Sequence, residues 1–374
     1  MRLAIATTTL QSCGGMERVV LKLAKRFDAH VYCLHYDPQK TFPEFKSLHV
    51  ESGSKVPIRL LPIGKRMVTG VEAGFYFYTL KLKGYDLINP HTSPSEWVRK
   101  NNSPALWNCH SPNREVYDLY EWRMSRRDPI TRAGYQAAIS VFKSLAGQSV
   151  PKIEKIICNS KNTQAVIKKY LDWEAEVISP GIDPQKFSCR GYEKFFFYPS
   201  RFTHEKNHQF ALEAFRIFSR RNPGWKLLLA GALMPEQEKY LKSLLLDAEK
   251  NVVVETNISE ERLCDLYSRC YCTLFPPVNE DFGLVPLESL ASSKPCIAID
   301  QGGPRETVDD MADGFLVQTP QEMAARMEQL ARHPETCEKM GKAGRKKVLE
   351  KFTWDVFLSK FEKAAKKVAN CTDQ

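Results

Sequence analysis

Several patterns that usually identify a protein class are missing from this sequence. None of the 11 cysteines forms a C-x-x-C pair, and the chain contains neither an Asp-x-Asp triplet nor a G-x-G-x-x-G run. Without paired cysteines a zinc or dithiol motif is disfavoured, and we expect the cysteines to be reduced thiols of the core. Without the glycine fingerprint a dinucleotide-dependent dehydrogenase is poorly supported.

A long hydrophobic run is also missing near the start of the chain. The uncharged stretch from Leu3 to Met16 covers 14 residues and is interrupted by polar side chains. Because a membrane-spanning helix needs about 20 mostly apolar residues, this stretch predicts neither such a helix nor a secretory signal. We therefore expect the protein on the cytoplasmic side of the membrane.

What the chain does contain is enough apolar material for folded domains. It has 374 residues, of which 43% are hydrophobic and 26% charged, a balance that excludes disorder and collagen-like repeats. At this length one core rarely suffices, so we expect two domains. The net charge is +10, and residues 1–190 carry 28 Lys and Arg against 17 Asp and Glu. This basic half favours an anionic partner, namely nucleic acid, acidic lipid headgroups or a phosphorylated substrate.

Short apolar runs that end in polar residues alternate with helical patterns along the whole chain. Parallel strands are buried on both faces, so this alternation predicts doubly wound α/β domains of the Rossmann type. The expected strands cover residues 2–8, 31–36, 59–63, 86–91, 105–110, 155–160, 194–202, 225–232, 251–256, 271–277, 294–300 and 314–318.

The change from one domain to the next is expected where two prolines and two glycines cluster, in residues 180–192. We place the first domain at 1–187, the second at 188–352 and a basic terminal helix at 353–374. The expected ligand site is a cleft between the two domains, at the carboxyl ends of both sheets.

Two carboxylates flank the start of one helix of the second half. Glu280 falls in the loop after a strand, and Glu288 falls in the first turns of the helix that follows. Backbone amides at a helix start lack intrahelical partners, so the segment from Phe282 through Gly283 to Leu284 would favour an anion. Phosphate and sugar hydroxyls are the ligand groups that we expect to bind there.

Two cations, Arg201 and Lys206, follow the first strand of the second half. Arginine supplies a planar fork and lysine a compact charge, so the pair suits a diphosphate. The Gly14-Gly15 pair follows the first strand of the chain and permits close approach of a phosphate or sugar to the backbone. His110 ends a strand of the first half at the mouth of the expected cleft, although a lone histidine is more often structural.

Five segments resemble glycosyltransferase family 4, the retaining enzymes of the GT-B fold, and they follow one another along the chain in the order found in that family. The most specific segment runs from Leu274 to Val308, where FPPVNEDFGLVPLESLASSKPCIAIDQGGPRETV resembles the family's E-x7-E region. The other segments are GGMERVV at Gly14, CHSPNR at His110, IICNSKNTQAVIKKYL with VISPGIDPQKF, and SRFTHEKN. The HSPNR and EDFG variants resemble a bacterial and archaeal subgroup of mannosyltransferases.

The resemblance implies a nucleotide-sugar donor held by the second domain and an acceptor held by the first. Arg201 and Lys206 would bind the donor diphosphate, and Glu288 the ribose hydroxyls. Fixed cations stabilise the negative charge left on the departing phosphate, so with no Asp-x-Asp triplet we expect neither a metal nor another cofactor. GDP-mannose is the expected donor, with UDP-glucose, UDP-galactose and UDP-N-acetylglucosamine left open.

The same resemblance assigns the transferred sugar and the stereochemistry. Glu280 and the amides of Phe282 and Gly283 would hold the sugar, Gly15 would lie close to the diphosphate, and His110 would contact the sugar beside the reacting carbon. Retention of configuration is implied, and we expect front-face attack in which the departing phosphate helps to take the acceptor proton. The terminal helix of such proteins crosses back to the first domain.

A membrane contact is expected from the first half. Its basic residues cluster around the apolar stretch 137–142 and could meet anionic lipid. These basic residues are Arg123, Arg126, Arg127, Arg132 and Lys143. The sequence thus predicts a peripheral enzyme on the inner face of the membrane, which acts on a glycan or lipid-linked acceptor.

Two other classes of protein stay open at this point. One is a nucleotide-sugar hydrolase or epimerase on the same fold, which acceptor-dependent release of nucleotide would distinguish from a transferase. The other is a basic protein that binds nucleic acid or membrane. Aromatic residues interleaved with the positive charges give a nucleic-acid partner only faint support, and we expect none.

Overall fold

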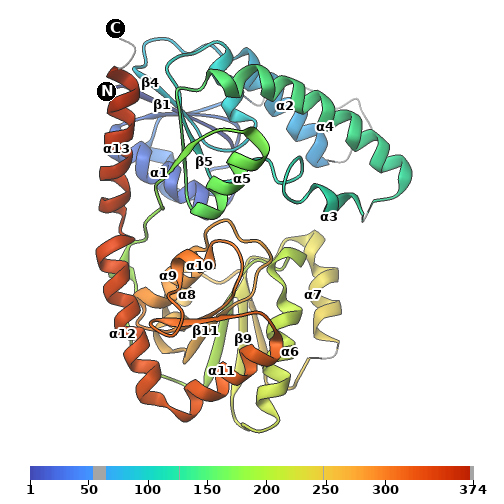
Figure 1. Ribbon diagram of the computed structural model, residues 1–374, viewed down its shortest axis with the longest axis vertical. Coiled ribbons are helices and arrows are strands. Elements are labelled where there is room, and N and C mark those ends of the chain that lie inside the picture. Colours follow the sequence, from blue (N-terminus) through green and yellow to red (C-terminus); the bar gives the residue numbers. More distant parts are fainter. Residues whose placement is uncertain (54–64, 126, 247, 371–374) are drawn as a thin grey trace. The chain divides into compact units, whose positions relative to one another are not determined.

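The computed structural model describes residues 1–53, 65–125, 127–246 and 248–370, and the expected strand at 59–63 lies outside them. Figure 1 shows the chain as two compact units. The first contains Met1–Ser179 together with the C-terminal segment from Phe357, and the second contains Pro180–Val356. The first unit thus ends at Ser179, eight residues before the boundary expected from the sequence.

The strands of the first unit are paired in parallel and form two sheets. Its strands are β1 (Leu3–Leu10), β2 (His30–Tyr36), β3 (Val50–Ser52), β4 (Leu87–Pro90), β5 (Leu106–Cys109), β6 (Lys155–Cys158) and β7 (Ala175–Val177). They form a β3-β2-β1-β4 sheet and a β5-β6-β7 sheet. A parallel bridge from Ile88 to Ala105 joins β4 to β5. The combined strand order reverses between β1 and β4.

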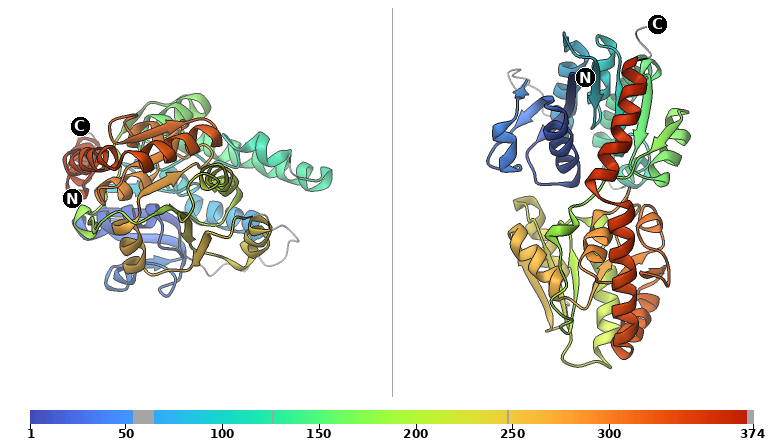
Figure 2. Two further views of the ribbon diagram at one scale, coloured as in Figure 1. Left: turned by 90° about the horizontal axis from the view of Figure 1, so that it is seen from below. Right: turned by 90° about the vertical axis from the view of Figure 1, so that its left-hand side faces the viewer.

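Helices of the first unit cover its sheets. They are α1 (Gly15–Phe27), α2 (Lys65–Thr79), α3 (Tyr120–Met124), α4 (Pro129–Ser149), α5 (Lys161–Leu171) and the 3-10 helices η1 (Pro43–Ser47), η2 (Ser95–Lys100) and η3 (Val150–Lys152). The sequence analysis did not expect α4, whose N-terminal half projects beyond the sheet of this unit (Figures 1 and 2). Asp128 caps α4 by accepting from the amides of Ile130 and Thr131.

The second unit is a six-stranded parallel sheet with helices on both faces (Figure 2). Its strands are β8 (Phe195–Pro199), β9 (Lys226–Gly231), β10 (Val252–Thr256), β11 (Cys272–Phe275), β12 (Cys296–Ile299) and β13 (Gly314–Val317). Its helices are α6 (His208–Ser219), α7 (Glu238–Leu245), α8 (Glu260–Arg269), α9 (Leu284–Ala291), α10 (Pro304–Thr307), α11 (Pro320–Arg332) and α12 (Pro334–Lys351), with the 3-10 helices η4 (Pro184–Lys186), η5 (His204–Lys206) and η6 (Pro235–Gln237).

Strand β8 shows why this sheet is buried on both sides. Successive side chains of a strand point to opposite faces, so Phe196 and Tyr198 join one hydrophobic cluster while Phe195 and Phe197 join the other. Phe196 stacks on Trp225 with ring centroids 5.0 Å apart. A strand that is apolar on every residue therefore needs helices on both faces, as predicted.

The last helix, α13 (Trp354–Asn370), packs on α1 of the first unit. Its N-terminal Thr353 caps it by accepting from the Val356 amide at 3.3 Å. The Phe361 and Phe27 rings lie 5.6 Å apart, and Arg26 pairs with Glu362 at 3.3 Å. The chain thus returns to the first unit after completing the second.

Most described cysteines lie in these cores, and none of the ten forms a disulfide. The expectation of core thiols is wrong for Cys13 and Cys189, which are exposed. Among the described residues no helix is long and apolar enough to cross a membrane.

Candidate active site

Strand order determines where the second unit can hold a ligand. The order β10-β9-β8-β11-β12-β13 means that the chain moves outward in opposite directions from β8 and from β11. These two strands are adjacent and parallel. Where the order reverses, the connections leave on opposite faces and open a crevice at the carboxyl ends of the strands. We call this place the β8–β11 switch point.

Two residues that were predicted to bind the donor lie together at the β8–β11 switch point. Lys206 ends the turn η5 after β8, and Glu280 lies in the loop after β11. The Lys206 Nζ is 2.6 Å from the Glu280 Oε2, and the side chains are only 15% and 24% exposed. The sequence analysis assigned these groups to different parts of a ligand, whereas the structure shows an ion pair. An anion that reaches Lys206 must therefore share this cation with Glu280.

Two further hydrogen bonds, one between backbones and one from a side chain, join the same two loops. The Val278 amide donates to the Glu205 carbonyl at 2.9 Å, and the Asn207 side-chain amide donates to the Pro276 carbonyl at 3.2 Å. These bonds hold Lys206 and Glu280 in register before any ligand arrives. Arg201 starts the loop after β8 and is exposed.

Two glycines allow a third loop to approach the site closely. Gly302, with a φ of 65°, and Gly303 follow β12, the neighbour of β11. The Gly303 amide donates to the Glu280 carbonyl at 2.8 Å. A Cβ on Gly303 would overlap the Phe282 backbone, so only glycine permits this approach.

Helix α9 begins at the same edge of the sheet. Gly283 precedes it with a φ of 88°, a conformation that favours glycine. The amides of its first turn lack intrahelical acceptors, and Pro286 removes one of them. The helix start therefore offers a partial positive charge beside Lys206 and Arg201. The Phe282 side chain is buried in the core, so only its backbone can contribute to a site.

Glu288 lies one turn into α9 and has a partner that the sequence analysis missed. The Tyr267 hydroxyl donates to the Glu288 Oε2 at 2.9 Å. Burial and the adjacent carboxylate raise the pKa of Tyr267 well above its usual value, which keeps this donor protonated. Tyr267 thereby holds the Glu288 carboxylate in a fixed position.

His208 is a second missed residue, and it supports the loop that carries Lys206. Its Nε2 is 2.8 Å from the Ser200 Oγ, and its ring stacks on Phe202. Burial, with a smaller contribution from Lys206, lowers the pKa of His208 to about 3, so the ring is neutral. No spacing in the sequence separates this histidine from an ordinary helix-start residue.

The first unit has an equivalent place between β1 and β4. Gly15 begins α1 after β1, and Gly14 precedes it in an extended conformation. The hydroxyls of Thr8, near the end of β1, and of Thr92, which follows β4, are 2.7 Å apart. We call this place the β1–β4 switch point. Gly14 and Gly15 thus lie at the sheet edge where a ligand of the first unit would bind.

His110 follows β5 at the same edge of the first unit. It is partly buried, and the His91 Nδ1 lies 2.8 Å from its Nε2. The Asn159 side chain donates to the His110 carbonyl at 2.8 Å. Burial lowers the pKa of His110 to about 4, so its ring is neutral at physiological pH.

An apolar groove begins at the β1–β4 switch point and runs between α2 and α4. It has a volume of about 750 Å³ and is lined by Thr8 and Thr9 at the end of β1, by Ser93 and Pro94 after β4, and by α2 and α4. The Trp97 ring of η2 lines it, with Phe142 of α4 4.9 Å away. We call this cavity the α2–α4 groove. This groove was not predicted from the sequence, because α4 was not expected.

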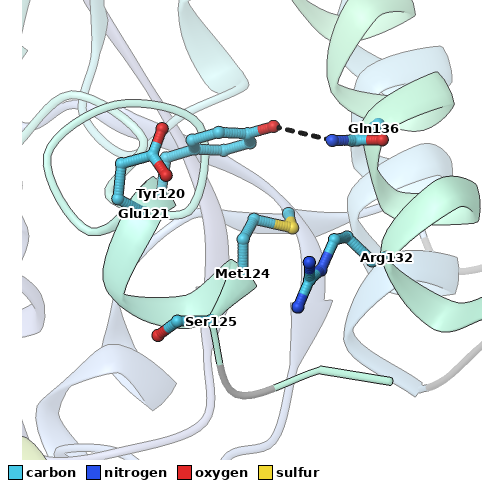
Figure 3. Close-up of a pocket in the computed structure, with 6 residues that line it drawn as sticks. All are labelled: Tyr120, Glu121, Met124, Ser125, Arg132 and Gln136. Atoms are coloured by element: carbon cyan, nitrogen blue, oxygen red, sulfur yellow. Dashed lines mark hydrogen bonds between the residues drawn. The ribbon is translucent and has the colours of Figure 1, made fainter. Parts of the chain in front are cut away.

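A smaller, polar pocket of about 440 Å³ lies between α3 and α4 (Figure 3). It is lined by Tyr120, Glu121, Met124, Ser125, Arg132 and Gln136. The Gln136 amide donates to the Tyr120 hydroxyl at 3.5 Å. This pocket contains no predicted site residue. Among the described residues no group of three or more His, Cys, Asp or Glu is arranged to hold a metal ion.

Both units match profiles of known protein families. The profile described as "Glycosyltransferase Family 4" matches residues 13–186, and the profile "Glycosyl transferases group 1" matches residues 182–347. The chain belongs to glycosyltransferase family 4. It is therefore an enzyme that transfers glycosyl groups, as the resemblance of its motifs implied.

Relatives of this family 4 enzyme include named mannosyltransferases. The alpha-1,3/1,6-mannosyltransferase ALG2 of Mus musculus is 27% identical, over 92% of this chain and 91% of that protein. The Dictyostelium discoideum ALG2 is 25% identical, over 95% and 96%. The structure of Anabaena HepE in complex with UDP-glucose is similar with a TM-score of 0.75 at 17% identity, over 98% and 100% of the two chains. This likeness confirms the GT-B class of fold.

Proposed function

We propose that this family 4 enzyme transfers mannose from GDP-mannose to a lipid-linked acceptor, with retention of configuration. The observation that carries the donor assignment is the convergence of Arg201, Lys206, Glu280 and the α9 helix start on the β8–β11 switch point. The choice of mannose rests on the relatives that are named mannosyltransferases.

The charges of this site suit the bond that must break. Cleavage of a sugar–diphosphate bond leaves negative charge on the phosphate, and Lys206, Arg201 and the α9 amides can stabilise that charge in fixed positions. Glu280, which is bonded to Lys206, would accept from sugar hydroxyls next to the diphosphate. These cations would take the place of a divalent metal, and transfer should persist in the presence of a chelator.

The nucleotide part of the donor is assigned to Glu288. A carboxylate that is fixed by Tyr267 can accept from two ribose hydroxyls at once. This arrangement recognises the ribose and is indifferent to the base. The base is therefore decided by other contacts, and HepE, described with UDP-glucose, keeps UDP-sugars as the second candidate.

A panel of nucleotide sugars tests the donor assignment. We expect GDP-mannose at about 100 times its Kd to stabilise the protein by about 2.7 kcal/mol, with a smaller effect from UDP-glucose and UDP-N-acetylglucosamine. Thermal unfolding of the full chain measures this difference. A larger shift with any UDP-sugar would replace mannose by that sugar in the proposal.

The acceptor assignment rests on the α2–α4 groove. Its walls are apolar, and at its inner end the hydroxyls of Thr8, Thr9 and Ser93 line it at the β1–β4 switch point. A lipid-linked sugar has the same pattern, because a hydrocarbon chain leads to a polar, phosphate-bearing head. We propose that the chain of the acceptor occupies this groove.

Charge on α4 agrees with an acceptor that resides in an anionic membrane. This helix contains no acidic residue, and its Arg132 and Lys143 are exposed. Of the other basic residues expected at a membrane, Arg127 pairs with Glu115 at 3.7 Å, Arg126 lies outside the described residues, and the Arg123 side chain is not described. Cosedimentation with anionic vesicles at low salt tests this contact. Absence of binding would contradict the proposed membrane contact of α4.

A substitution that fills the groove separates the acceptor chain from the rest of the reaction. Gly70 lines the groove on α2, and a Cβ there would meet nothing within 4 Å. Gly70→Leu removes the helix penalty of glycine, so the protein should fold. Loss of room for about two methylene groups should raise the KM for a long-chain acceptor about 10-fold. The KM for a short-chain analogue should not change.

Gly147→Leu is the matched control. Gly147 lies on α4 away from the groove, and a Cβ there also meets nothing within 4 Å. This variant should transfer to both acceptors as the unmodified enzyme does. If Gly70→Leu changes both acceptors equally, the groove does not bind the hydrocarbon chain.

A further inference from the structure

Three side chains in the first unit form a hydrogen-bonded chain that ends at His110. Asn89 and His91 lie at the end of β4 and are fully buried. The Asn89 Oδ1 is 2.8 Å from the His91 Nε2, and the His91 Nδ1 is 2.8 Å from the His110 Nε2. Of these three residues, only His110 was expected in the site from the sequence, as a contact of the transferred sugar, and the other two were expected as part of a strand.

The backbone determines which way the Asn89 amide faces. Its Nδ2 donates to the Leu106 carbonyl at 2.6 Å, and a carbonyl can only accept. The other atom of the amide is therefore the oxygen, which can only accept from the His91 Nε2. It follows that His91 carries a proton on Nε2.

The second nitrogen of His91 then follows from its charge. Burial, with a smaller contribution from His110, lowers the pKa of His91 well below its usual value, so the ring is neutral. A neutral imidazole with a proton on Nε2 has a bare Nδ1, which is an acceptor. The 2.8 Å contact to His110 consequently requires a proton on the His110 Nε2.

We propose that Asn89 and His91 are positioning residues that hold His110 in the tautomer with a proton on Nε2 and a bare Nδ1. His110 then offers a ligand a hydrogen-bond acceptor. This inference rests on the proposed function, since it specifies what His110 recognises: a hydroxyl that donates its proton, on the sugar or on the acceptor. An anionic phosphate oxygen could not bind at this nitrogen.

The backbone around His91 supports a fixed ring. Its amide lies 2.9 Å from the Ala6 carbonyl of β1 and 3.0 Å from the Ser95 Oγ, and its carbonyl accepts from the Trp107 indole at 3.2 Å. The ring is therefore held by the sheet itself. A triad in which a buried acceptor sets a histidine tautomer works by the same principle.

Nitrogen NMR of the full chain with labelled histidine reads the tautomer directly. The chain has eight histidines, and comparison with His110→Gln and His91→Gln assigns the two signals. We expect His110 with a protonated Nε2 and an unprotonated Nδ1. The reverse assignment would overturn the proposal, whatever the enzyme transfers.

Asn89→Asp should reverse the direction of the hydrogen bond between His91 and His110. A carboxylate beside the His91 Nε2 favours the charged ring, which carries protons on both nitrogens. His91 would then donate to the His110 Nε2, and His110 would move its own proton to Nδ1. We expect this exchange in the NMR spectrum together with a fall in kcat of about 10- to 100-fold, the loss found when the partner that orients a metal-ligating histidine is removed. An unchanged His110 tautomer in this variant would contradict the relay.

A second pair of variants covers the case in which Asn89→Asp does not fold. His91→Gln keeps one donor and one acceptor between Asn89 and His110, whereas His91→Phe keeps neither. The glutamine variant should retain the His110 tautomer and most of the activity, and the phenylalanine variant should lose both. Equal spectra in the two variants would overturn the proposal. Absence of transfer by the unmodified enzyme from every donor would instead overturn the proposed function.

Discussion

Lys206→Ala should lower kcat by about 10²- to 10³-fold, the loss typical of removing one fixed donor from a developing negative charge. The side chain is mostly buried at the β8–β11 switch point, 2.6 Å from Glu280. Its removal takes away the cation that would stabilise the departing phosphate and leaves a carboxylate in its place. Steady-state kinetics with saturating acceptor measure this change.

Stability separates this role from a structural one. Removing one partner of a mostly buried ion pair leaves an unpaired carboxylate and costs about 3–5 kcal/mol, so unfolding in urea is measured for Lys206→Ala and its kcat is taken where the variant is fully folded. Lys226→Ala is the matched control, because this exposed lysine begins β9 at the opposite edge of the same sheet. The control should keep full activity. A kcat for Lys206→Ala within threefold of the unmodified enzyme would show that Lys206 does not bind the diphosphate.

Glu288→Gln should lower kcat/KM by about 100-fold, which corresponds to about 2.7 kcal/mol. The amide keeps the size of the side chain but presents one acceptor oxygen in place of two, so it cannot accept from both ribose hydroxyls and from Tyr267. Hydrogen bonds to a charged acceptor contribute about 1.5–3 kcal/mol each, so loss of one accounts for the effect. Kinetics with a varied donor concentration measure it.

Two comparisons define the origin of that loss. A donor without ribose hydroxyls should be a poor substrate of the unmodified enzyme. Glu288→Gln should use this donor equally poorly, because the variant no longer binds the ribose hydroxyls. Asp313→Asn is the control for a buried carboxylate, since Asp313 pairs with Lys347 away from the switch point. It should reduce stability and leave the KM for donor unchanged. A large preference for ribose that survives in Glu288→Gln would contradict the assignment.

The architecture of both units was predictable because most of the strands are short apolar runs that end in polar residues, whereas β3 (VES) and β7 (AEV) contain charged or polar residues and were not expected. β8 reads as a strand buried on both faces, and its neighbours in sequence repeat the pattern. The start of α13 was also predictable, since Thr353 before an amphipathic run is a strong cap signal. Local preference and burial agree at these places.

What the sequence could not predict depends on contacts between distant segments. Lys206 and Glu280 are 74 residues apart, and their ion pair follows from the adjacency of β8 and β11, which no local pattern encodes. The link from His91 to His110 depends in the same way on the adjacency of β4 and β5. Helix α4 was missed although Asp128 and Pro129 mark its start, because its basic residues were interpreted only as a membrane contact.

The central claim is that, of two sheets with the same reversal of strand order, the second holds the donor. A crystal structure of the full chain with GDP-mannose tests it most directly. We predict the diphosphate within hydrogen-bond distance of the Lys206 Nζ and the α9 amides, with a ribose hydroxyl on Glu288. A nucleotide held by the first unit alone, with no contact to Lys206, Glu288 or the α9 amides, would contradict the account.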